Sequence, residues 1–568
     1  MQAPGWQRSR RVNCRRAPDP QGLFRNDATK SAMVMTLSPR AVLDRYAADD
    51  GTLPTWLAAR CALVPDAPAL VFAHRRWTYR QLEAAVEACA GVLAGHGVRA
   101  GDPVAFCAGN SDLTVVAFLA CARLGALFAP LNAALTDTEL GWLLKHTAPR
   151  VVLAAAAQVA RLEALGAGLI TPPGFLALEA LGLTASDADA VTRGLHALAA
   201  PVPSGSAPGA RTPLVVVYTS GTTGFPKGVL HSHRNYLWAA EAFVERMHLQ
   251  PDERLLTVLP FFHINALFYS LGGALAAGAC LIIAESFSAS RFWDFATETG
   301  ATQFNTLAAV GGILCKRPRD EFNPRHVLRK IYGGPISPEV ETVFREEFGV
   351  THVVEGYGMS EIPGACNNPF EGLHKPGSMG LPARHPRHGA FVEMRVMDDA
   401  GQACGPDEPG ELEVRTPIVF DAYLRDPAQT QAAFNGEWFR TGDVVRRDAD
   451  GYFFFVARRK DIIRVRGENV SGAELDRVLG EHPAVAEAAV LGVPAAVGDE
   501  DILAVLVARD VRPSFEEIAD WARQHLAAIK IPRLWVWADS LPHTPSHRVA
   551  KHLLRKETTL LEQAMPLR

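Results

Sequence analysis

The chain has almost no excess of either charge. Its 568 residues include 57 Lys and Arg against 61 Asp and Glu, which gives a formal net charge of −4. Proteins that bind nucleic acid show a basic surplus, so nucleic acid is excluded as the main partner. Hydrophobic residues at 48% and charged residues at 21% exclude a disordered, coiled-coil or collagen-like chain. At about 150 residues per domain, this length predicts three to four structural units.

Patterns of metal-binding or disulfide-bonded cysteines are also missing. The nine cysteines, at positions 14, 61, 89, 107, 121, 280, 315, 366 and 404, form no C-x-x-C pair and no zinc-like spacing with histidine. Their odd number and wide scatter indicate reduced thiols, several of them packed as small apolar side chains. We therefore expect a cytoplasmic protein.

Long uninterrupted apolar segments are absent as well. The uncharged segment over residues 266–284 has 19 residues and is nominally long enough to span a bilayer. Gly272, Gly273 and Gly278 interrupt it, and residues 280–284 have the character of a short buried strand. The run therefore predicts a buried helix followed by a buried strand, without stable membrane insertion.

The N-terminal segment lacks the apolar core of a secretory signal. Residues 1–35 contain six Arg and one Lys against two Asp, with almost no apolar periodicity. We expect residues 1–40 to be a disordered tail or the product of a start codon placed too far upstream, with Met33 or Met35 as the real start. An organellar presequence has the same composition and stays open.

A regular alternation begins after Trp77. Thr78 is a candidate N-cap for a helix that ends near Gly97, with Leu82, Val86, Ala90 and Leu93 at helical spacing. Residues 103–107, 112–124 and 126–130 then read as strand, helix and strand. Such a βαβ unit predicts a parallel sheet with a right-handed crossover, and the alternation continues to about residue 360. The fold class is therefore α/β.

The pattern changes after about residue 385. Short β segments at 411–415 and 452–456, with a turn at 448–451, predict a small β-rich subdomain. From about residue 461, Ser471 with Glu474 and Ser514 with Glu517 have the spacing of capping boxes that open helices. Residues 485–491 and 502–507 between them read as strands, so the end of the chain is predicted to be a small α+β domain.

A loop at residues 218–228 has the composition of a phosphate site. It reads Tyr-Thr-Ser-Gly-Thr-Thr-Gly-Phe-Pro-Lys-Gly and follows a predicted strand, residues 214–218. Glycines and small hydroxyl residues let backbone N–H groups converge on an anion, and Ser220, Thr222 and Thr223 add donors. Lys227 adds a positive charge. The loop differs from a Walker A motif, because Pro226 stands where glycine is required and no G-K-[ST] occurs.

With this loop in view, the sequence resembles the adenylate-forming superfamily over about residues 50–556. Leu259–His263 resembles the proline–aromatic–histidine segment near the acyl pocket, and Arg466–Asn469 resembles the loop beside the coenzyme A thiol. The other matching segments are 333–335 and 356–361 for adenine, 439–443 for ribose and 458–461 for the hinge. Residues 355–386 most resemble the carnitine/crotonobetaine-CoA ligase-like branch.

The resemblance implies an acid–thiol ligase of the AMP-forming acyl-CoA synthetase type. A carboxylate attacks the α-phosphate of ATP, pyrophosphate leaves, and the coenzyme A thiol takes the acyl group from the acyl-adenylate. Charge develops on phosphate oxygens, so such a site needs fixed donors and a metal more than a general base. The expected products are acyl-CoA, AMP and pyrophosphate, with ATP, Mg²⁺ and coenzyme A as cofactors.

The resemblance also implies roles for individual residues. Lys227, Thr222 and Thr223 hold phosphates, and Glu361 and Thr222 ligate Mg²⁺. Tyr357 stacks on adenine. Asp443 accepts hydrogen bonds from the ribose hydroxyls with the help of Arg458. His263 lies near the acyl group. The remaining nucleotide- and coenzyme-binding candidates are Thr219, Ser220, Gly221, Thr223, Gly224, Gly333, Gly334, Pro335, Gly356, Gly358, Ser360, Lys460, Arg466 and Gly467.

One position departs from the family pattern. The catalytic lysine of the family follows a Thr-x-[Thr/Ser]-Gly motif, and alignment on Thr544 and Ser546 places Arg548 there. Arginine supplies a cation that can bridge carboxylate and phosphate, and Lys551 is the competing candidate. Two alternatives therefore stay open: a ligase that forms acyl-AMP without coenzyme A, and a non-catalytic AMP- or ATP-binding relative.

Substrate and domain expectations complete the prediction. Amino-acid-activating relatives carry an acid for the substrate ammonium, whereas this chain has Phe262–Asn265 at that place, so we expect a small carboxylic acid without a free α-ammonium. Trp238, Phe262, His263 and residues 306–312 and 362–365 are candidates for the acyl pocket. We expect a large AMP-binding domain over residues 41–459, a mobile small domain over 460–568 with its hinge at Lys460, and a monomer or homodimer.

Overall fold

The computed structural model describes residues 36–46, 51–169, 171–182, 184–203, 207–219, 226–465, 468–495, 500–543 and 549–567. Residues Ser38–Arg568 form one compact unit, to which the following description applies. The predicted N-terminal tail lies outside the described residues up to position 35. Its last residues lead into a short helix, α1 (Pro39–Leu43), whose N-cap Ser38 accepts a hydrogen bond from the Ala41 N–H.

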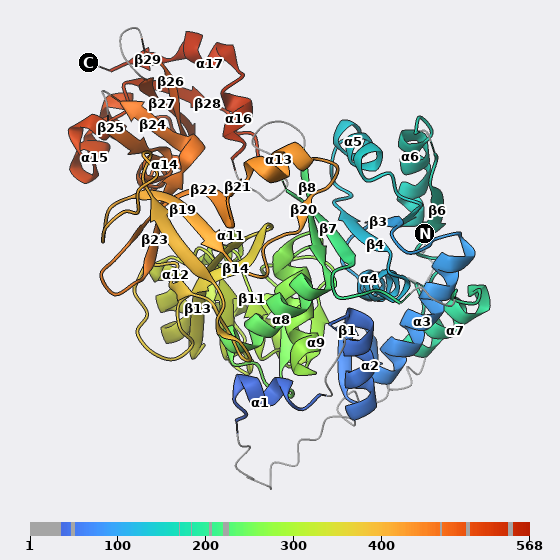
Figure 1. Ribbon diagram of the computed structural model, residues 1–568. Coiled ribbons are helices and arrows are strands. Elements are labelled where there is room, and N and C mark those ends of the chain that lie inside the picture. The colour runs from blue at the N-terminus through green and yellow to red at the C-terminus, as the bar shows by residue number, and fades with distance from the viewer. Residues whose placement is uncertain are drawn as a thin grey trace, which may run out of the picture. The chain divides into compact units, whose positions relative to one another are not determined.

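A seven-stranded sheet contains the predicted βαβ unit. Strands β3 (Pro103–Cys107) and β4 (Leu127–Leu131) are parallel neighbours joined by α4 (Asp112–Leu124). The sheet has the order β20-β8-β7-β4-β3-β5-β6, with β5 (Val151–Ala154), β6 (Gly174–Ala177), β7 (Pro213–Thr219), β8 (Lys227–Ser232) and β20 (Ala422–Tyr423). Strands β8 and β20 pair in antiparallel fashion at one end, as the ribbon in Figure 1 shows.

Further helices belong to this part of the molecule. They are α2 (Leu53–Leu63), α3 (Tyr79–Gly95), α5 (Asp137–Thr147), α6 (Ala156–Gly166) and α7 (Ala188–Leu198). Helix α3 begins after Thr78 with a complete capping box to Gln81, and the apolar positions predicted from the sequence are buried. The N-cap prediction for this helix is therefore confirmed.

A nine-stranded sheet forms the second large layer. Its order is β15-β14-β13-β12-β11-β9-β10-β1-β2, with β1 (Pro68–Phe72), β2 (Arg75–Thr78), β9 (Arg254–Thr257), β10 (Cys280–Ile283), β11 (Gln303–Asn305), β12 (Lys330–Gly333), β13 (His352–Met359), β14 (Ile362–Asn367) and β15 (Leu381–Pro382). Its central pairs are parallel, and the hairpin β13–β14 is antiparallel. The accompanying helices are α8 (His233–Met247), α9 (Gly272–Ala277), α10 (Phe292–Thr299), α11 (Ala308–Lys316) and α12 (Pro338–Thr342).

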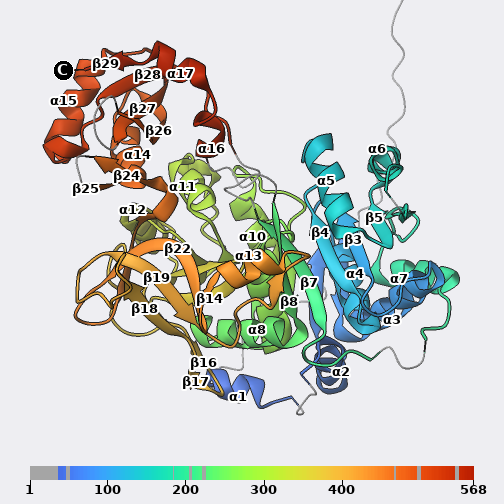
Figure 2. The same ribbon diagram turned by 45° about the horizontal axis from the view of Figure 1, so that its top comes forward.

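The 266–284 run lies in the interior of this part of the molecule. It forms most of a π-helix, Asn265–Leu271, then α9 and β10, and its side chains are buried. Helix α9 packs against α8, as Figure 1 shows, and Figure 2 shows α8 beside β8. The prediction of a buried helix and strand is confirmed. Within the described residues, no helix combines the length and the apolar character needed to cross a membrane.

A five-stranded antiparallel sheet follows, as the texture after residue 385 predicted. It consists of β18 (Glu393–Met397), β19 (Gly410–Arg415), β21 (Phe434–Asn435), β22 (Trp438–Arg447) and β23 (Phe453–Arg458), with α13 (Pro427–Ala432) and the hairpin β16 (Arg384–His385) and β17 (Gly389–Ala390) beside it. The turn before β23 closes on Asp448, whose side chain accepts the N–H groups of Asp450 and Tyr452.

The C-terminal elements have sheets and a core of their own. They are β24 (Ile462–Val465), β25 (Glu468–Ser471), α14 (Gly472–Gly480), β26 (Val485–Pro494), β27 (Glu500–Ala508), α15 (Phe515–His525), β28 (Leu534–Ala538), α16 (Lys551–Leu554), α17 (Thr558–Gln563) and β29 (Met565–Pro566). Two apolar clusters, one around Leu506 and Trp535 and one around Leu491 and Val505, draw only on residues after 462. The predicted α+β character is confirmed.

The two predicted capping boxes form on the serine side. Ser471 accepts the N–H of Glu474, and Ser514 accepts the N–H of Glu517. The carboxylate of Glu474 instead accepts two hydrogen bonds from Lys530, at 2.8 and 2.7 Å. A nearby ammonium is a stronger partner for a carboxylate than a backbone amide, which explains the difference.

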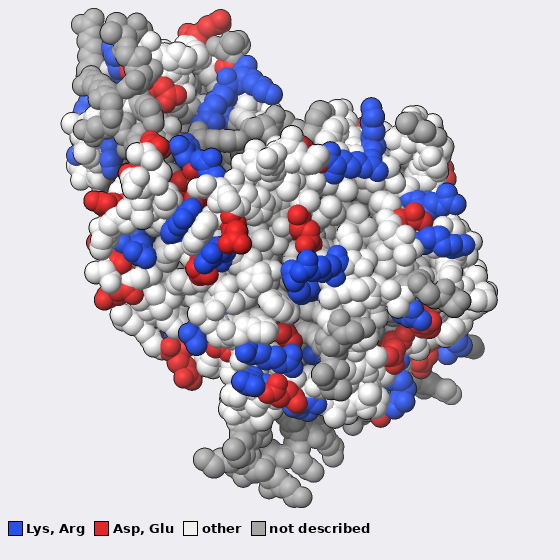
Figure 3. All heavy atoms as spheres, viewed as in Figure 1, with Lys and Arg blue, Asp and Glu red and all other residues white. Residues whose placement is uncertain are grey.

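The surface charges and the cysteines agree with what the composition predicted. On the face shown in Figure 3, basic and acidic side chains interleave without a large field of one sign. In the described part of the chain eight cysteines are free thiols, and six of them are buried. Burial raises the pKa of Cys89 to about 12 and of Cys107 to about 11, so these thiols stay protonated and pack as apolar groups.

Candidate functional site

The predicted phosphate loop connects β7 to β8. Thr219 ends β7 and is in register with Lys227, the first residue of β8. The two ends of the loop are therefore adjacent on one antiparallel ladder. Ser220, Gly221, Thr222, Thr223 and Gly224 lie outside the described residues.

The start of this loop is held by a polar cluster on α5. The hydroxyl of Tyr218 is hydrogen-bonded to Nδ1 of His146 at 3.0 Å and to the hydroxyl of Thr147 at 2.7 Å. The His146 ring stacks on Trp142 at 4.6 Å between ring centroids. Burial, and after it the positive charge of Arg425, lower the pKa of His146, so the imidazole is neutral at pH 7. Nothing in the sequence indicated this support.

Lys227, Glu361 and Tyr423 meet where the two large sheets come together. Glu361 follows β13 and is 6% exposed, and its carboxylate accepts a hydrogen bond from the Tyr423 hydroxyl at 2.8 Å. The ammonium of Lys227 lies 4.9 Å from the centre of the Tyr423 ring. Burial raises the pKa of Glu361, whereas the Tyr423 hydrogen bond and the charge of Lys227 act against that rise. Tyr423 was not among the predicted residues.

The turn that carries Glu361 is held from two further directions. Nε2 of the buried His231 lies 2.6 Å from the carbonyl oxygen of Ser360, and the N–H of Phe420 donates to the carbonyl oxygen of Glu361 at 2.8 Å. Because a carbonyl only accepts, Nε2 of His231 carries the proton. Burial lowers the pKa of His231 to about 4, which keeps the ring neutral. The predicted Ser360 is thus fixed through its backbone.

Tyr357, Asp443 and Arg458 form a second cluster. The Tyr357 hydroxyl donates to one carboxylate oxygen of Asp443, and the other lies 2.8 Å from Nε of Arg458. Asp443 has no exposed surface, and it pairs across the β22–β23 ladder with Arg458. Burial, and after it the negative charge of Asp443, raise the pKa of Tyr357 well above its usual value. The structure therefore brings the predicted adenine, ribose and arginine residues together.

The predicted glycine pairs lie where two loops touch. A Cβ at Gly334 would overlap the carbonyl oxygen of Gly356, and one at Gly333 would lie 2.8 Å from Cγ2 of Thr306. A Cβ at Gly358 would likewise come within 3.0 Å of the Tyr269 hydroxyl. Only glycine permits such approaches, and at Gly334 the absence of a side chain lets the 333–335 loop lie against Gly356 of the 356–361 loop. Pro335 follows in the same loop.

Glu355 directly precedes Gly356 and was not among the site residues predicted from the sequence. It is half-buried on β13, and its carboxyl accepts the N–H of Ile336, next to Pro335. Burial, which outweighs this hydrogen bond, raises the pKa of Glu355 to about 8. A carboxyl that holds its proton near neutral pH is both a donor and an acceptor beside the predicted adenine loops.

The predicted proline–aromatic–histidine segment lies beside the nine-stranded sheet. Asn110 fixes it, because its side chain donates to the carbonyl oxygen of Leu259 at 2.9 Å and accepts the N–H of Phe261 at 3.2 Å. The ring of Phe262 contacts that of His263 edge-on at 4.7 Å. Trp238, a candidate for the acyl pocket, instead packs against His388 at 4.6 Å.

Comparison with known proteins explains this convergence of motifs. The profile of the family described as "AMP-binding enzyme" matches residues 57–424, and that described as "AMP-binding enzyme C-terminal domain" matches residues 474–548. The chain belongs to the AMP-binding enzyme family.

Individual relatives agree with the family. An indoleacetate–CoA ligase from Aromatoleum aromaticum is 33% identical over 529 residues, which cover 90% of this chain and 99% of that protein. The crystal structure of ATP-bound MatB from Rhodopseudomonas palustris has a TM-score of 0.78 and 26% identity over 89% of this chain and 98% of that one. The o-succinylbenzoate CoA synthetase from Bacillus subtilis, in complex with its acyl-adenylate intermediate OSB-AMP, has a TM-score of 0.74 and 27% identity over 88% and 98%.

These matches confirm the predicted class of enzyme. The chain is an AMP-forming acid–CoA ligase, with ATP and coenzyme A as co-substrates, and its α/β architecture is that of adenylate-forming enzymes. The narrower likeness to the carnitine/crotonobetaine branch stays a prediction.

Near the C-terminus of this AMP-binding enzyme, Lys551 begins α16. Its ammonium pairs with Asp476 of α14 at 2.5 Å, and the two side chains are 12% and 26% exposed. Asp476 also accepts the N–H of Val490 at 2.6 Å. Lys551 is thus part of the packing of the C-terminal elements. Arg548, Arg466 and Gly467 lie outside the described residues, as does the side chain of Lys460.

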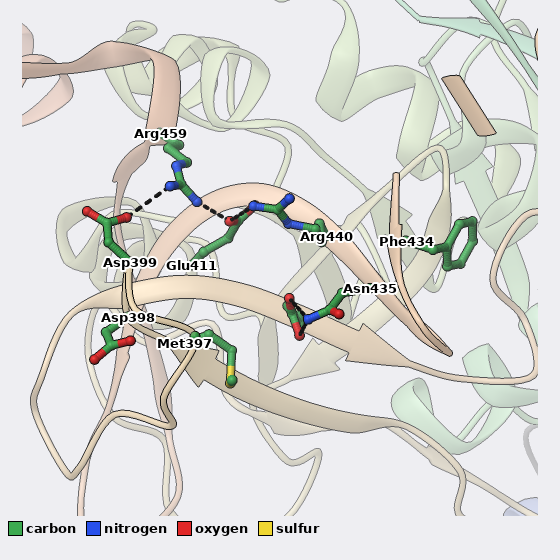
Figure 4. Close-up of a pocket in the computed structure, with 10 residues that line it drawn as sticks. Met397, Asp398, Asp399, Glu411, Phe434, Asn435, Arg440 and Arg459 are labelled. Atoms are coloured by element: carbon green, nitrogen blue, oxygen red, sulfur yellow. Dashed lines mark hydrogen bonds and ion pairs between the residues drawn. The ribbon is translucent and has the colours of Figure 1, made fainter. Parts of the chain in front are cut away.

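The segment just before Lys460 is tied to the five-stranded sheet. Arg459 pairs with Asp399 at 2.9 Å and with Glu411, and Glu411 also pairs with Arg440 at 2.8 Å. These residues line a hollow of about 310 Å³, and Figure 4 shows both arginines pointing toward Glu411. Every arginine of the hollow is therefore engaged by a carboxylate, and the backbone of the AMP-binding enzyme is anchored next to the predicted hinge.

Proposed function

We propose that this AMP-binding enzyme activates a small carboxylic acid at the site where Lys227, Glu361, Tyr357, Asp443 and Arg458 converge. The observation that carries the proposal is that convergence: the charges of Lys227 and Arg458 both act on the Glu361 carboxylate, and Arg458 pairs with Asp443, to which Tyr357 donates a hydrogen bond. The five residues come from five different strands or turns. In the first half-reaction the acid displaces pyrophosphate from ATP, and in the second the coenzyme A thiol displaces AMP from the acyl-adenylate.

The phosphates of ATP bind the 219–224 loop and Lys227. The backbone N–H groups and hydroxyls of such a loop supply donors, and the ammonium of Lys227 supplies charge where negative charge develops on the α-phosphate. The antiparallel pairing of Thr219 with Lys227 supports this role, because it fixes both ends of the loop. The Tyr218–His146 contact fixes its first residues.

The nucleoside binds between the two glycine-rich loops and the Asp443–Arg458 pair. Asp443 accepts the ribose hydroxyls, with Arg458 holding its carboxylate, and Tyr357 stacks on adenine. Support comes from the contacts of the buried Asp443 with both of the other residues. The base binds between two loops. One loop contains Gly333, Gly334 and Pro335, and the other contains Gly356 and Gly358.

Mg²⁺ fits this site through Glu361. In the described part of the chain no Lys or Arg forms an ion pair with this buried carboxylate, whose partner is the neutral hydroxyl of Tyr423. A carboxylate that forms no ion pair with a side-chain cation would suit Mg²⁺ as a hard oxygen ligand, and the other ligands would be phosphate oxygens, water and the hydroxyl of Thr222. The ion supplies charge neutralisation on the phosphate oxygens when bound. The described residues contain no cluster of three or more metal ligands.

Arg548 provides the cation that the family takes from lysine. It bridges the substrate carboxylate and the α-phosphate, which requires a positive charge and donors but no proton transfer. The pairing of Lys551 with Asp476 supports this choice, because it gives Lys551 a packing role in the C-terminal elements. His263 lies beside the acyl group at the other end of the site.

The large domain spans residues 41–459, and the small domain, residues 460–568, turns about Lys460 between the half-reactions. The turn presents Arg548 for adenylation and the Arg466–Asn469 loop for thioester formation. Support comes from the separate apolar clusters after residue 462 and from the ion pairs of Arg459.

The acid is a small carboxylic acid without a free α-ammonium. The segment Phe262–Asn265 offers no carboxylate for an ammonium. The names of the relatives support this class, since they act on indoleacetate and o-succinylbenzoate. We further propose that the enzyme works in the cytoplasm as a monomer or homodimer, consistent with its free thiols.

The test is acid-dependent exchange of pyrophosphate into ATP in the presence of Mg²⁺. The proposal predicts exchange with at least one acid of a panel of aryl-acetic, aromatic, short aliphatic and dicarboxylic acids. AMP binding without exchange for any acid would indicate a non-catalytic relative. Exchange with release of acyl-AMP, and no thioester on addition of coenzyme A, would indicate the ligase that works without coenzyme A.

A further inference from the structure

We infer that Tyr423 is a positioning residue that sets the carboxylate of Glu361 and the ammonium of Lys227 relative to each other. The inference rests on the proposed function and assigns to Tyr423 a task in holding magnesium-bound ATP. The hydroxyl acts on the carboxylate and the ring acts on the ammonium, so the two parts of one side chain serve the two charged groups.

The hydroxyl defines where the Glu361 carboxylate lies. It donates to Oε1 at 2.8 Å, and both side chains are buried, each 6% exposed. A buried carboxylate that lacks a hydrogen-bond donor is costly and rotates to find one. Tyr423 holds Oε1, and the backbone N–H of Glu361 is the other donor to this carboxylate, so its remaining lone pairs are available to a cation.

The ring defines where the Lys227 ammonium lies. Nζ stands 4.9 Å from the ring centre, within the range of a cation–π contact. A lysine ammonium on a four-carbon stem has many rotamers. The aromatic face favours the one that keeps the charge beside Glu361 and the start of the phosphate loop.

The backbone of Tyr423 is fixed to the elements that carry both partners. Tyr423 is in register with Val229 of β8, and the N–H of Leu424 donates to the carbonyl oxygen of Gly228 at 2.7 Å, next to Lys227. On the other side the N–H of Phe420 donates to the carbonyl oxygen of Glu361. Residues 420–424 therefore join the seven-stranded sheet to the β13–β14 hairpin.

Two substitutions separate the two parts of the side chain. Tyr423→Phe removes the hydroxyl and keeps the ring, and Tyr423→Leu removes both. The matched control is Tyr452→Phe, since Tyr452 is also buried, donates its hydroxyl to the Leu373 carbonyl and has Lys375 at 4.8 Å from its ring centre. None of the recorded contacts of Tyr452 involves Glu361 or Lys227.

The readouts are calorimetric binding of ATP with and without Mg²⁺, binding of AMP without Mg²⁺, and the Mg²⁺ concentration for half-maximal pyrophosphate exchange. For Tyr423→Phe we expect this Mg²⁺ concentration to rise about fivefold, with AMP affinity and metal-free ATP affinity within twofold of wild type. For Tyr423→Leu we expect metal-free ATP affinity to fall a further threefold or so. Tyr452→Phe should leave all three unchanged.

Two results would overturn the inference. One is an unchanged Mg²⁺ requirement in both Tyr423 variants of an active enzyme. The other is a parallel loss of AMP and ATP binding together with a lower unfolding temperature, which is the signature of a purely structural tyrosine. Failure of the proposed function looks different, because the wild-type protein would then show no Mg²⁺-dependent ATP binding and no exchange.

Discussion

The hydroxyl of Tyr357 donates a hydrogen bond to the buried carboxylate of Asp443, from a position 86 residues earlier in the chain. Tyr357 belongs to β13 of the nine-stranded sheet and Asp443 to β22 of the five-stranded sheet. This contact joins the two subdomains at the nucleoside site. It couples the residue proposed to stack on adenine with the residue proposed to bind ribose.

Nucleotide affinity should depend far more on Asp443 than on the Tyr357 hydroxyl. Asp443→Asn removes the charge that strengthens two ribose hydrogen bonds and leaves Arg458 unpaired, so the Kd for AMP should rise about 30-fold. Tyr357→Phe keeps the stacking ring and should raise it about fivefold. Calorimetric titration with AMP measures both. Equal effects of the two substitutions would contradict the assigned roles.

Substitution of Arg548 should lower pyrophosphate exchange, whereas substitution of Lys551 should lower stability. Arg548→Ala should lower pyrophosphate exchange about 100-fold with an unchanged unfolding temperature and unchanged AMP binding, and Arg548→Lys should retain activity. Lys551→Met leaves Asp476 without its cation and should cost about 2 kcal/mol of stability, less than a fully buried pair because both groups retain some exposure. The double variant with Asp476→Asn should recover part of that loss. Loss of exchange in folded Lys551→Met would reverse the assignment.

The hinge should be sensitive to Arg459 and indifferent to Arg440. Both arginines pair with Glu411, but only Arg459 is the direct neighbour of Lys460. Arg459→Ala should therefore alter the ratio of thioester formation to pyrophosphate exchange about threefold, whereas Arg440→Ala should preserve this ratio. Lys460→Pro provides the reference, with exchange retained and thioester formation lost. The two half-reactions are assayed separately. An equal loss of both half-reactions in Lys460→Pro would remove the basis for a hinge there.

Stability should fall in acid through His231. Its pKa is lowered from the ordinary 6.5 to about 4 in the folded protein, so the unfolded chain binds the proton more readily. The neutral ring stabilises the fold fully above pH 6.5, and this contribution, about 3 kcal/mol, is lost as pH falls from 6.5 to 4. His231→Gln keeps a donor for the Ser360 carbonyl and should lose that part of the pH dependence. Denaturant unfolding across this range checks it, with the exposed His196→Gln as control.

Local patterns predicted the architecture well. The β3–α4–β4 unit, the Thr78 N-cap and the buried 266–284 segment follow from periodicity and capping chemistry, which act within a few residues. The resemblance to the family implied that the glycines of the 333–335 and 356–361 segments belong to adenine-binding loops. Their physical reason, a backbone approach between Gly334 and Gly356, emerges only when the two loops are placed together.

The contacts that connect distant segments could not be predicted in the same way. Tyr423 lies in a short strand, and nothing in residues 418–426 indicates that its hydroxyl meets Glu361, 62 positions earlier. His146 likewise reaches Tyr218 over 72 positions. Such partners depend on the crossing of two sheets, which local patterns do not specify. Trp238 shows the converse, since an aromatic near the site turned out to pack on His388.

The central claim is that one active site carries out both half-reactions. The most direct measurement incubates the full-length protein with ATP, Mg²⁺ and each acid of the panel, with and without coenzyme A, and quantifies AMP, pyrophosphate and acyl-CoA by mass spectrometry. The account predicts, for at least one acid, equal amounts of AMP, pyrophosphate and acyl-CoA when coenzyme A is present, and turnover limited to about one per site without it. Sustained AMP formation without coenzyme A, or no AMP with any acid, would contradict it.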